Sequence, residues 1–153
     1  MMVDYINIFL ISMIPIGELR FSIPYGILGL SLIPLYVVVF SLLGNILIGI
    51  LVIYIIGPIM FLMRKNKFFN YIIQVIFKRT RARSKLIYDL KFYGLIIFIS
   101  IPLPLTGVWT GSLASYLFGF SKKKSVLAVV IGVFLSSSIV SILTLFTDYY
   151  ISL

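Results

Sequence analysis

Residues 14–34 constrain the fold of this chain more than any other stretch. The stretch is apolar enough to lie in a membrane, yet it contains Glu18, Arg20, three prolines and three glycines. Charged groups inside hydrocarbon are costly and are rarely placed there without a partner or a function. Proline also removes a backbone donor, so Pro15 and Pro24 would leave a lipid-exposed helix with unsatisfied groups. We therefore expect a helix that enters the bilayer, breaks near these prolines and leaves on the side from which it entered.

The composition indicates an integral membrane protein. Hydrophobic residues make up 61% of the 153 residues and charged residues only 11%, whereas soluble domains have about 45–50% and 25%. Cysteine and histidine are both absent, which excludes disulfides, thiolate metal sites and histidine bases. We therefore predict no cofactor and no metal site. An enzyme is not expected either, because few reaction classes remain.

The basic residues cluster just outside the apolar segments. Nine of the thirteen lie in residues 64–91, three are Lys122–Lys124, and the last is Arg20. This pattern is typical of cytoplasmic loops that contact anionic lipid headgroups, and it does not favour nucleic acid as a partner. Apolar residues at helical spacing interrupt the basic residues of 64–91, so we predict a basic amphipathic linker at the membrane surface.

The chain consists of two similar halves. Each half has a short apolar helix, a turn rich in proline and glycine, a second short helix and a long apolar span. Residues 9–15 (Phe-Leu-Ile-Ser-Met-Ile-Pro) resemble residues 98–102 (Phe-Ile-Ser-Ile-Pro), and paired interrupted segments in a repeat are typical of transporter cores. We predict one membrane domain, residues 1–153, with repeat 1 at about 3–63, the linker at 64–91 and repeat 2 at about 92–148.

The two long spans are predicted at residues 34–63 and 125–147, both free of charged residues. Asn45 lies in the middle of the first span. We expect it to form a hydrogen bond to a neighbouring helix rather than to contact a substrate.

Two topologies fit the short helices. If residues 5–30 and 92–120 each crossed the membrane, residues 64–91 and Lys122–Lys124 would face opposite sides, which the positive-inside tendency disfavours. If both are re-entrant hairpins, the chain crosses twice and twelve of the thirteen basic residues lie on one side. We therefore predict an all-α integral membrane protein, an inverted repeat of a re-entrant helical hairpin plus a transmembrane helix. It would be a multi-pass protein of the cell (inner or plasma) membrane, with both termini outside and the basic segments cytoplasmic.

Two motifs resemble those of the small multidrug export family. They are Glu18-Leu-Arg20-Phe-Ser-Ile-Pro24-Tyr-Gly26 and Pro102-Leu-Pro-Leu-Thr106-Gly107-Val-Trp109-Thr110-Gly111. This family is in turn similar to the DedA/VTT membrane proteins, which pair two re-entrant hairpins with transmembrane helices and are associated with moving phospholipids and polyprenyl phosphates. The resemblance implies that Glu18 and Arg20 are the acidic and basic members of the first loop. The second loop differs from that of DedA proteins, because it lacks their further acidic residues and arginines.

The candidate binding residues are Glu18, Arg20, Pro24, Thr106, Gly107, Trp109 and Thr110. A guanidinium suits phosphate or carboxylate, and broken helices direct free N–H groups at an anion. Glu18 would carry a proton, unless it and Arg20 form only a structural ion pair. Trp109 would pack on an isoprenoid tail or a flat cation, or else anchor the chain at the membrane interface.

Three functions follow from these residues. The first is a small secondary transporter or flippase of the DedA-like type for an anionic lipid such as a polyprenyl phosphate, proton-coupled through Glu18. The second is efflux of lipophilic cationic drugs, with Glu18 as the exchanging carboxylate and no need for Arg20. The third is a scaffold or accessory subunit that transports nothing. Two crossings provide little buried volume, so we expect a homodimer or larger assembly.

Overall fold

The structure, a computed structural model, describes residues 2–63, 85–103 and 106–151, and these residues form helices and turns without any strand. The elements are α1 (Met2–Ser12), α2 (Glu18–Pro24), the π-helical turn η1 (Tyr25–Gly29), α3 (Pro34–Met63), α5 (Lys85–Ser100), α6 (Val108–Leu117) and α7 (Lys122–Ile151). Most of the predicted basic linker lies outside the described residues.

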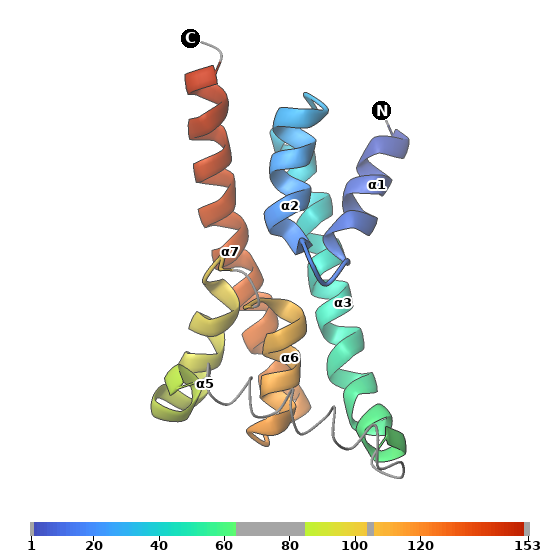
Figure 1. The fold of residues 1–153 in the computed structure, drawn as a ribbon, viewed down its shortest axis with the longest axis vertical. Coiled ribbons are helices and arrows are strands. Elements are labelled where there is room, and N and C mark those ends of the chain that lie inside the picture. Colours follow the sequence, from blue (N-terminus) through green and yellow to red (C-terminus); the bar gives the residue numbers. More distant parts are fainter. Residues whose placement is uncertain (1, 64–84, 104–105, 152–153) are drawn as a thin grey trace.

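Two long helices run through the molecule, with α2 and α6 packed between them and α1 and α5 on their outer sides (Figure 1). Figure 1 shows α1 running from one end of the molecule to its middle and α2 returning to the same end. Helices α5 and α6 do the same from the opposite end, so the turns of the two hairpins approach each other near the middle. Helix α3 contacts α1 and α6, and α7 contacts α5 and α2, so each long helix packs on both hairpins.

Helices α3 and α7 are both long and apolar enough to cross a membrane. Each has 30 residues and therefore extends about 45 Å at 1.5 Å per residue, more than the hydrocarbon thickness of about 30 Å. The most apolar part of each has a mean hydropathy of 2.6. By contrast, α1 has 11 residues and extends only about 16 Å.

The long helices expose much of their apolar surface. On α7 the exposed side chains include Leu135, Ile139, Ile142 and Phe146. Contiguous apolar surface of this kind needs an apolar environment or a partner. An apolar solvent around α3 and α7 satisfies this requirement.

The first helix break lies at residues 13–17 and does not extend to Pro24. Helix α2 begins at Glu18 and continues through Pro24 into η1. Proline has no N–H to bond the preceding turn, and the backbone widens directly after it, with the Leu30 N–H bonding the Tyr25 carbonyl at 3.0 Å. The expectation that the helix breaks near both prolines is therefore wrong for Pro24, because the π-helical turn accommodates that residue.

Close packing between the long helices and the hairpins depends on glycine. A Cβ atom on Gly44 of α3 would overlap the Phe9 carbonyl oxygen and the Ser12 hydroxyl of α1. A Cβ atom on Gly132 of α7 would lie 2.7 Å from the Cβ of Ile99 in α5. The first helix of each hairpin thus packs closely on a glycine of a long helix.

Asn45 forms the interhelical hydrogen bond that the sequence predicts. Its side-chain amide donates to the Ser12 carbonyl at 2.8 Å, and the residue is fully buried. Ser12 is the last residue of α1, where the final carbonyls have no partner within the helix. This hydrogen bond from α3 therefore satisfies a free carbonyl at the end of α1.

We predict that Gly44→Ala lowers the free energy of unfolding by about 1–3 kcal/mol, the usual effect of overpacking. Gly57→Ala is the matched control, because a Cβ there meets only Tyr116 at an ordinary 3.8 Å. Thermal unfolding in detergent measures both. Equal stability of the two variants would contradict the close packing of α1 on α3.

Candidate functional site

The Glu18 carboxylate lies across the gap between the two hairpins and binds the start of α6. Its oxygens accept hydrogen bonds from the backbone N–H groups of Val108 at 3.2 Å and Trp109 at 3.3 Å. These first N–H groups have no acceptor within the helix, and the preceding Gly107 has no side chain to cap them. Glu18 therefore acts as the N-terminal cap of α6, where a negative charge is also favoured by the helix dipole.

Glu18 adopts an unusual backbone conformation in this position. Its φ is 52°, in the left-handed region that residues other than glycine rarely adopt. Only 7% of the residue is exposed, and burying a carboxylate is unfavourable unless its oxygens are hydrogen-bonded. The two hydrogen bonds to α6 thus hold the residue in a conformation that its local sequence does not favour.

The Arg20 guanidinium binds the other side of the second turn. Its Nη1 donates to the Leu103 carbonyl, and its Nη2 lies 3.2 Å from the Ile101 carbonyl and 3.4 Å from the Thr106 hydroxyl. Ile101 and Leu103 follow the end of α5, and the Thr106 hydroxyl also lies at hydrogen-bonding distance from both of their carbonyls. Arg20 therefore binds the turn that follows α5, on the side where the helix dipole favours a positive charge.

Trp109 of the second hairpin also donates a hydrogen bond to the first hairpin. Its indole Nε1 donates to the Met13 carbonyl at 3.1 Å. Met13 directly follows α1, so this carbonyl also lacks a partner within its helix. Side chains of each turn thus form hydrogen bonds to free backbone groups at the other turn.

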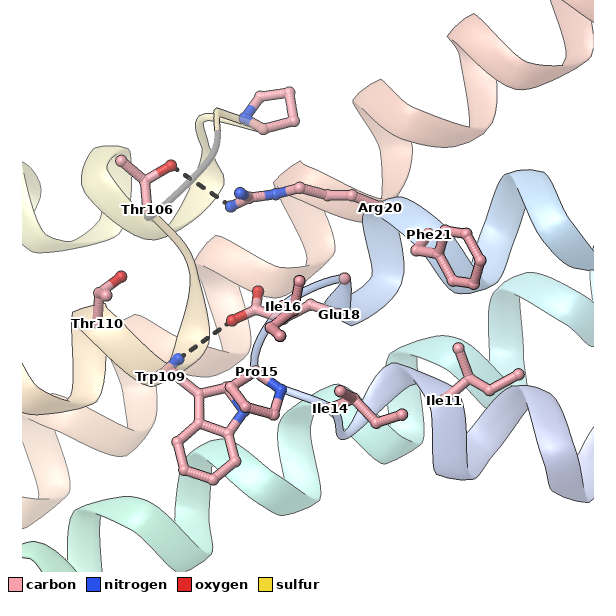
Figure 2. A pocket seen from close by; sticks show the side chains of 12 residues that line it. Ile11, Ile14, Pro15, Ile16, Glu18, Arg20, Phe21, Thr106, Trp109 and Thr110 are labelled. Carbon is pink, nitrogen blue, oxygen red and sulfur yellow. Dashed lines mark hydrogen bonds between the residues drawn. The ribbon is translucent and has the colours of Figure 1, made fainter.

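Glu18 and Arg20 do not pair with each other among the contacts of the described residues. Figure 2 shows one hydrogen bond from Arg20 to Thr106 and another between Glu18 and Trp109, on two sides of the second turn. A Cβ atom on Gly107 would overlap Glu18 Oε2 and lie 2.9 Å from Arg20 Nη2. Only glycine allows both charged groups to approach the backbone here, and its φ of 138° also requires glycine.

A cavity of about 760 Å³ lies beside these contacts. Five predicted site residues line it: Glu18, Arg20, Thr106, Trp109 and Thr110. Gly107 lies at the Glu18 contact, whereas Pro24 lies elsewhere and lines a separate cavity of about 310 Å³. The structure thus brings together six of the seven predicted site residues but not Pro24.

Four of the six residues in the apolar wall of this cavity lie outside the two sequence motifs, and only Phe21 and Pro102 belong to them. That wall is formed by Ile11, Ile14, Pro15, Ile16, Phe21 and Pro102. Their signal in the sequence is position alone, because all of them lie in or next to the two turns. The sequence does not distinguish an isoleucine that lines a cavity from an isoleucine that faces lipid.

The residues that the structure describes contain no group of three acidic, cysteine or histidine side chains able to hold a metal ion. The polar groups available to a ligand in the cavity are the Glu18 carboxylate, the Arg20 guanidinium and the hydroxyls of Thr106 and Thr110.

Fold and site together define a helical membrane protein with two membrane-length helices and a polar contact between two hairpin turns. Residues 18–139 match the family described as "Putative small multi-drug export protein". The match covers most of the chain, so the chain belongs to this family. The description names an export role and no enzymatic activity, which supports a role in membrane transport. Comparisons with curated proteins and with solved structures find no match.

We predict that Gly107→Ala separates the two turns. The added strain at positive φ and the overlap with Glu18 should lower the free energy of unfolding by about 2–4 kcal/mol. The emission of Trp109, the only tryptophan in the chain, should shift to longer wavelength as its indole loses the Met13 carbonyl.

Gly119→Ala is the control for that substitution. Gly119 also has a positive φ, of 70°, but nothing lies within 4 Å of a Cβ there. This variant should lose only about 1–2 kcal/mol and keep the emission spectrum. An unchanged spectrum in Gly107→Ala would mean that the two turns do not depend on this glycine.

Proposed function

We propose that this chain exports lipophilic, cationic small molecules and that the cavity between the hairpin turns binds them. The observation that carries the proposal is the composition of that cavity. Its wall is mainly aliphatic and aromatic, and it contains a carboxylate from Glu18, which is almost fully buried. Apolar walls with a few placed polar groups are typical of sites for small molecules.

A cation with apolar substituents matches the apolar wall and the Glu18 carboxylate, while the Arg20 guanidinium, which also lines the cavity, is held by carbonyls of the second turn. The isoleucines and Phe21 offer apolar contact, and the rings of Phe21 and Trp109 offer faces that attract a cation. The Glu18 carboxylate provides the opposite charge in a region of low polarity, where electrostatic attraction is stronger than in water. Affinity would come from the apolar wall and selectivity for charge from Glu18.

The contacts give less support to an anionic lipid, the first function predicted from the sequence. A headgroup phosphate would need the donors of Arg20 or the N–H groups that begin α6. The Nη atoms of Arg20 already donate to Ile101, Leu103 and Thr106, and the start of α6 is capped by Glu18, so of these donors only the buried Nε of Arg20 is without a hydrogen-bond partner among the described residues. DedA-like lipid transport would therefore require the two turns to separate first.

Glu18 is the residue that would couple substrate movement to protons. A carboxylate that binds a cation releases it when the carboxylate takes up a proton, because the opposite charge is then gone. Proton and substrate would thus occupy Glu18 in turn, which permits exchange of one for the other. Protonation would also weaken the cap on α6 and loosen the contact between the turns.

We further propose that the two hairpins are re-entrant and that the halves form an inverted repeat. Each hairpin reverses near the middle of the molecule, from opposite ends. The contact of Gly44 with α1 has a counterpart in the contact of Gly132 with α5. We also propose a homodimer or larger assembly, because two crossings leave the hairpin backbone little surrounding protein.

The orientation of this arrangement can be tested with single cysteines, since the chain has none of its own. Lys123 and Asp148 are both exposed, near opposite ends of α7. We predict that an impermeant thiol reagent added to intact cells labels Asp148→Cys but not Lys123→Cys, because the lysine cluster faces the cytoplasm. Labelling of Lys123→Cys from outside would overturn the orientation.

Two ions of the same shape and opposite charge test the substrate class. Tetraphenylphosphonium and tetraphenylborate differ in charge while offering nearly the same apolar surface. We predict that the cation quenches the emission of Trp109 at lower concentration than the anion. Glu18→Gln should weaken cation binding about tenfold, equivalent to about 1.4 kcal/mol, and leave anion binding unchanged or stronger.

Glu18→Gln keeps the side-chain shape and a carbonyl oxygen that can accept a hydrogen bond from α6. Comparing the wild type with this variant also cancels partition of both ions into detergent. Preferential binding of the anion, lost in Arg20→Leu, would instead support an anionic lipid. Equal binding of both ions by all folded variants would favour a scaffold without a transport site.

A further inference from the structure

A second cavity, of about 440 Å³, lies between α1 and η1. Its lining includes Asp4, Asn7 and Leu10 from α1 and Tyr25 from η1. None of these residues belongs to the contact between the turns. We call this cavity the α1–η1 groove.

The groove adjoins the cavity at the turns. Ile11 and Ile14 line both of them. On the opposite wall, Phe21 lines the cavity and Tyr25 lines the groove, and their rings stack at 5.6 Å with an angle of 9° between planes. We call the residues that are shared or stacked at this boundary, Ile11, Ile14, Phe21 and Tyr25, the partition between the two spaces.

The side chains of this partition are not locked in a core. Ile14 is 49% exposed and Phe21 is 55% exposed. Exposed side chains change rotamer within nanoseconds, far faster than a transport cycle. Figure 2 shows Phe21 and Ile11 on the side of the cavity away from Thr106 and Thr110, so the groove extends from the first hairpin and not from the second.

The groove leads to the end of the molecule where both termini lie. Helix α1 begins at that end, and α7 finishes there (Figure 1). The cluster Lys122–Lys124 begins α7 at the opposite end, where Lys122 Nζ lies 4.8 Å from the centre of the Tyr54 ring. The groove therefore opens away from the described lysine cluster, on the side that carries Asp4.

We propose that the α1–η1 groove is a second binding site for the lipophilic cation and the outer half of its export route. The cation leaves Glu18, passes between the Ile11–Ile14 wall and the Phe21–Tyr25 stack, and reaches the mouth beside Asp4. Aromatic faces along the path and a carboxylate at its mouth both suit a cation. This inference rests on the proposed function.

Protection of a single cysteine tests the site. Asn7 lines the groove, whereas the neighbouring Ile6 is 49% exposed and does not line it. We expect tetraphenylphosphonium to slow modification of Asn7→Cys by an impermeant maleimide at least threefold, in the full chain in detergent. Modification of Ile6→Cys should keep its rate, which controls for loss of reagent into micelles.

Quenching of Trp109 in the same samples separates this inference from the proposed function. Quenching together with protection of Asn7→Cys alone supports the route. Quenching without that protection overturns the groove while the proposed function stands. Protection without quenching overturns the proposed function and the export route, because the cation would then bind the groove without reaching the central cavity. The absence of both signals overturns the proposed function and the groove together.

The efflux rates of two carboxylate variants provide a second test of the groove. Asp4 lines the groove, and Asp148 lies near the end of α7 outside it. We expect Asp4→Asn to slow efflux of tetraphenylphosphonium from vesicles severalfold while Trp109 quenching stays as in the wild type. Asp148→Asn should leave efflux unchanged. Equal efflux by the two variants would overturn the role of the groove.

Discussion

A broken helix in an apolar environment must have its free backbone groups satisfied by other parts of the protein, and the rest of this structure depends on that requirement. Each hairpin turn leaves carbonyls at the end of one helix and N–H groups at the start of the next. The side chains that satisfy them come largely from elsewhere in the chain. Asn45 binds the last carbonyl of α1, Trp109 binds the Met13 carbonyl, Arg20 binds two carbonyls of the turn after α5, and Glu18 binds the first N–H groups of α6. The two turns therefore form one unit that neither hairpin can complete by itself.

This arrangement gives the charged residues two roles. Glu18 and Arg20 have the residue types of a substrate site, yet their hydrogen bonds go mainly to backbone groups of the second turn and the start of α6. A buried acceptor left without its partner costs about 1–3 kcal/mol, so a substitution that removes either side chain affects folding as well as binding. Isosteric changes and ligands of matched shape are therefore needed to separate stability from substrate recognition.

Much of the fold could be predicted from the sequence, because apolar runs and helix breakers are local signals. The spans over α3 and α7 and the turns beside Pro15 and Pro102 follow from them. The sequence predicts a break near Pro24 because proline usually ends a helix, whereas the accommodation of Pro24 depends on the wider turn η1 that follows it. The partners of the two charged residues are harder to predict than the helix breaks. Glu18 and Arg20 lie two residues apart, which suggests an ion pair, whereas their actual partners are set by how the hairpins meet. The apolar wall of the cavity has no distinctive residue type at all.

The span of chain between Glu18 and its partner has a consequence for biosynthesis. Glu18 and Trp109 are separated by 91 positions, and synthesis at about 5–20 residues per second needs on the order of 5–20 s to cover that distance. During this time the first turn has its charges and open carbonyls but no second turn to receive them. Burying these groups in hydrocarbon without partners is unfavourable, so the first turn stays in water or at the headgroup region during this time. In the proposed re-entrant arrangement, insertion of the first hairpin to its final depth is thus a late event, completed only when the second hairpin has emerged from the ribosome.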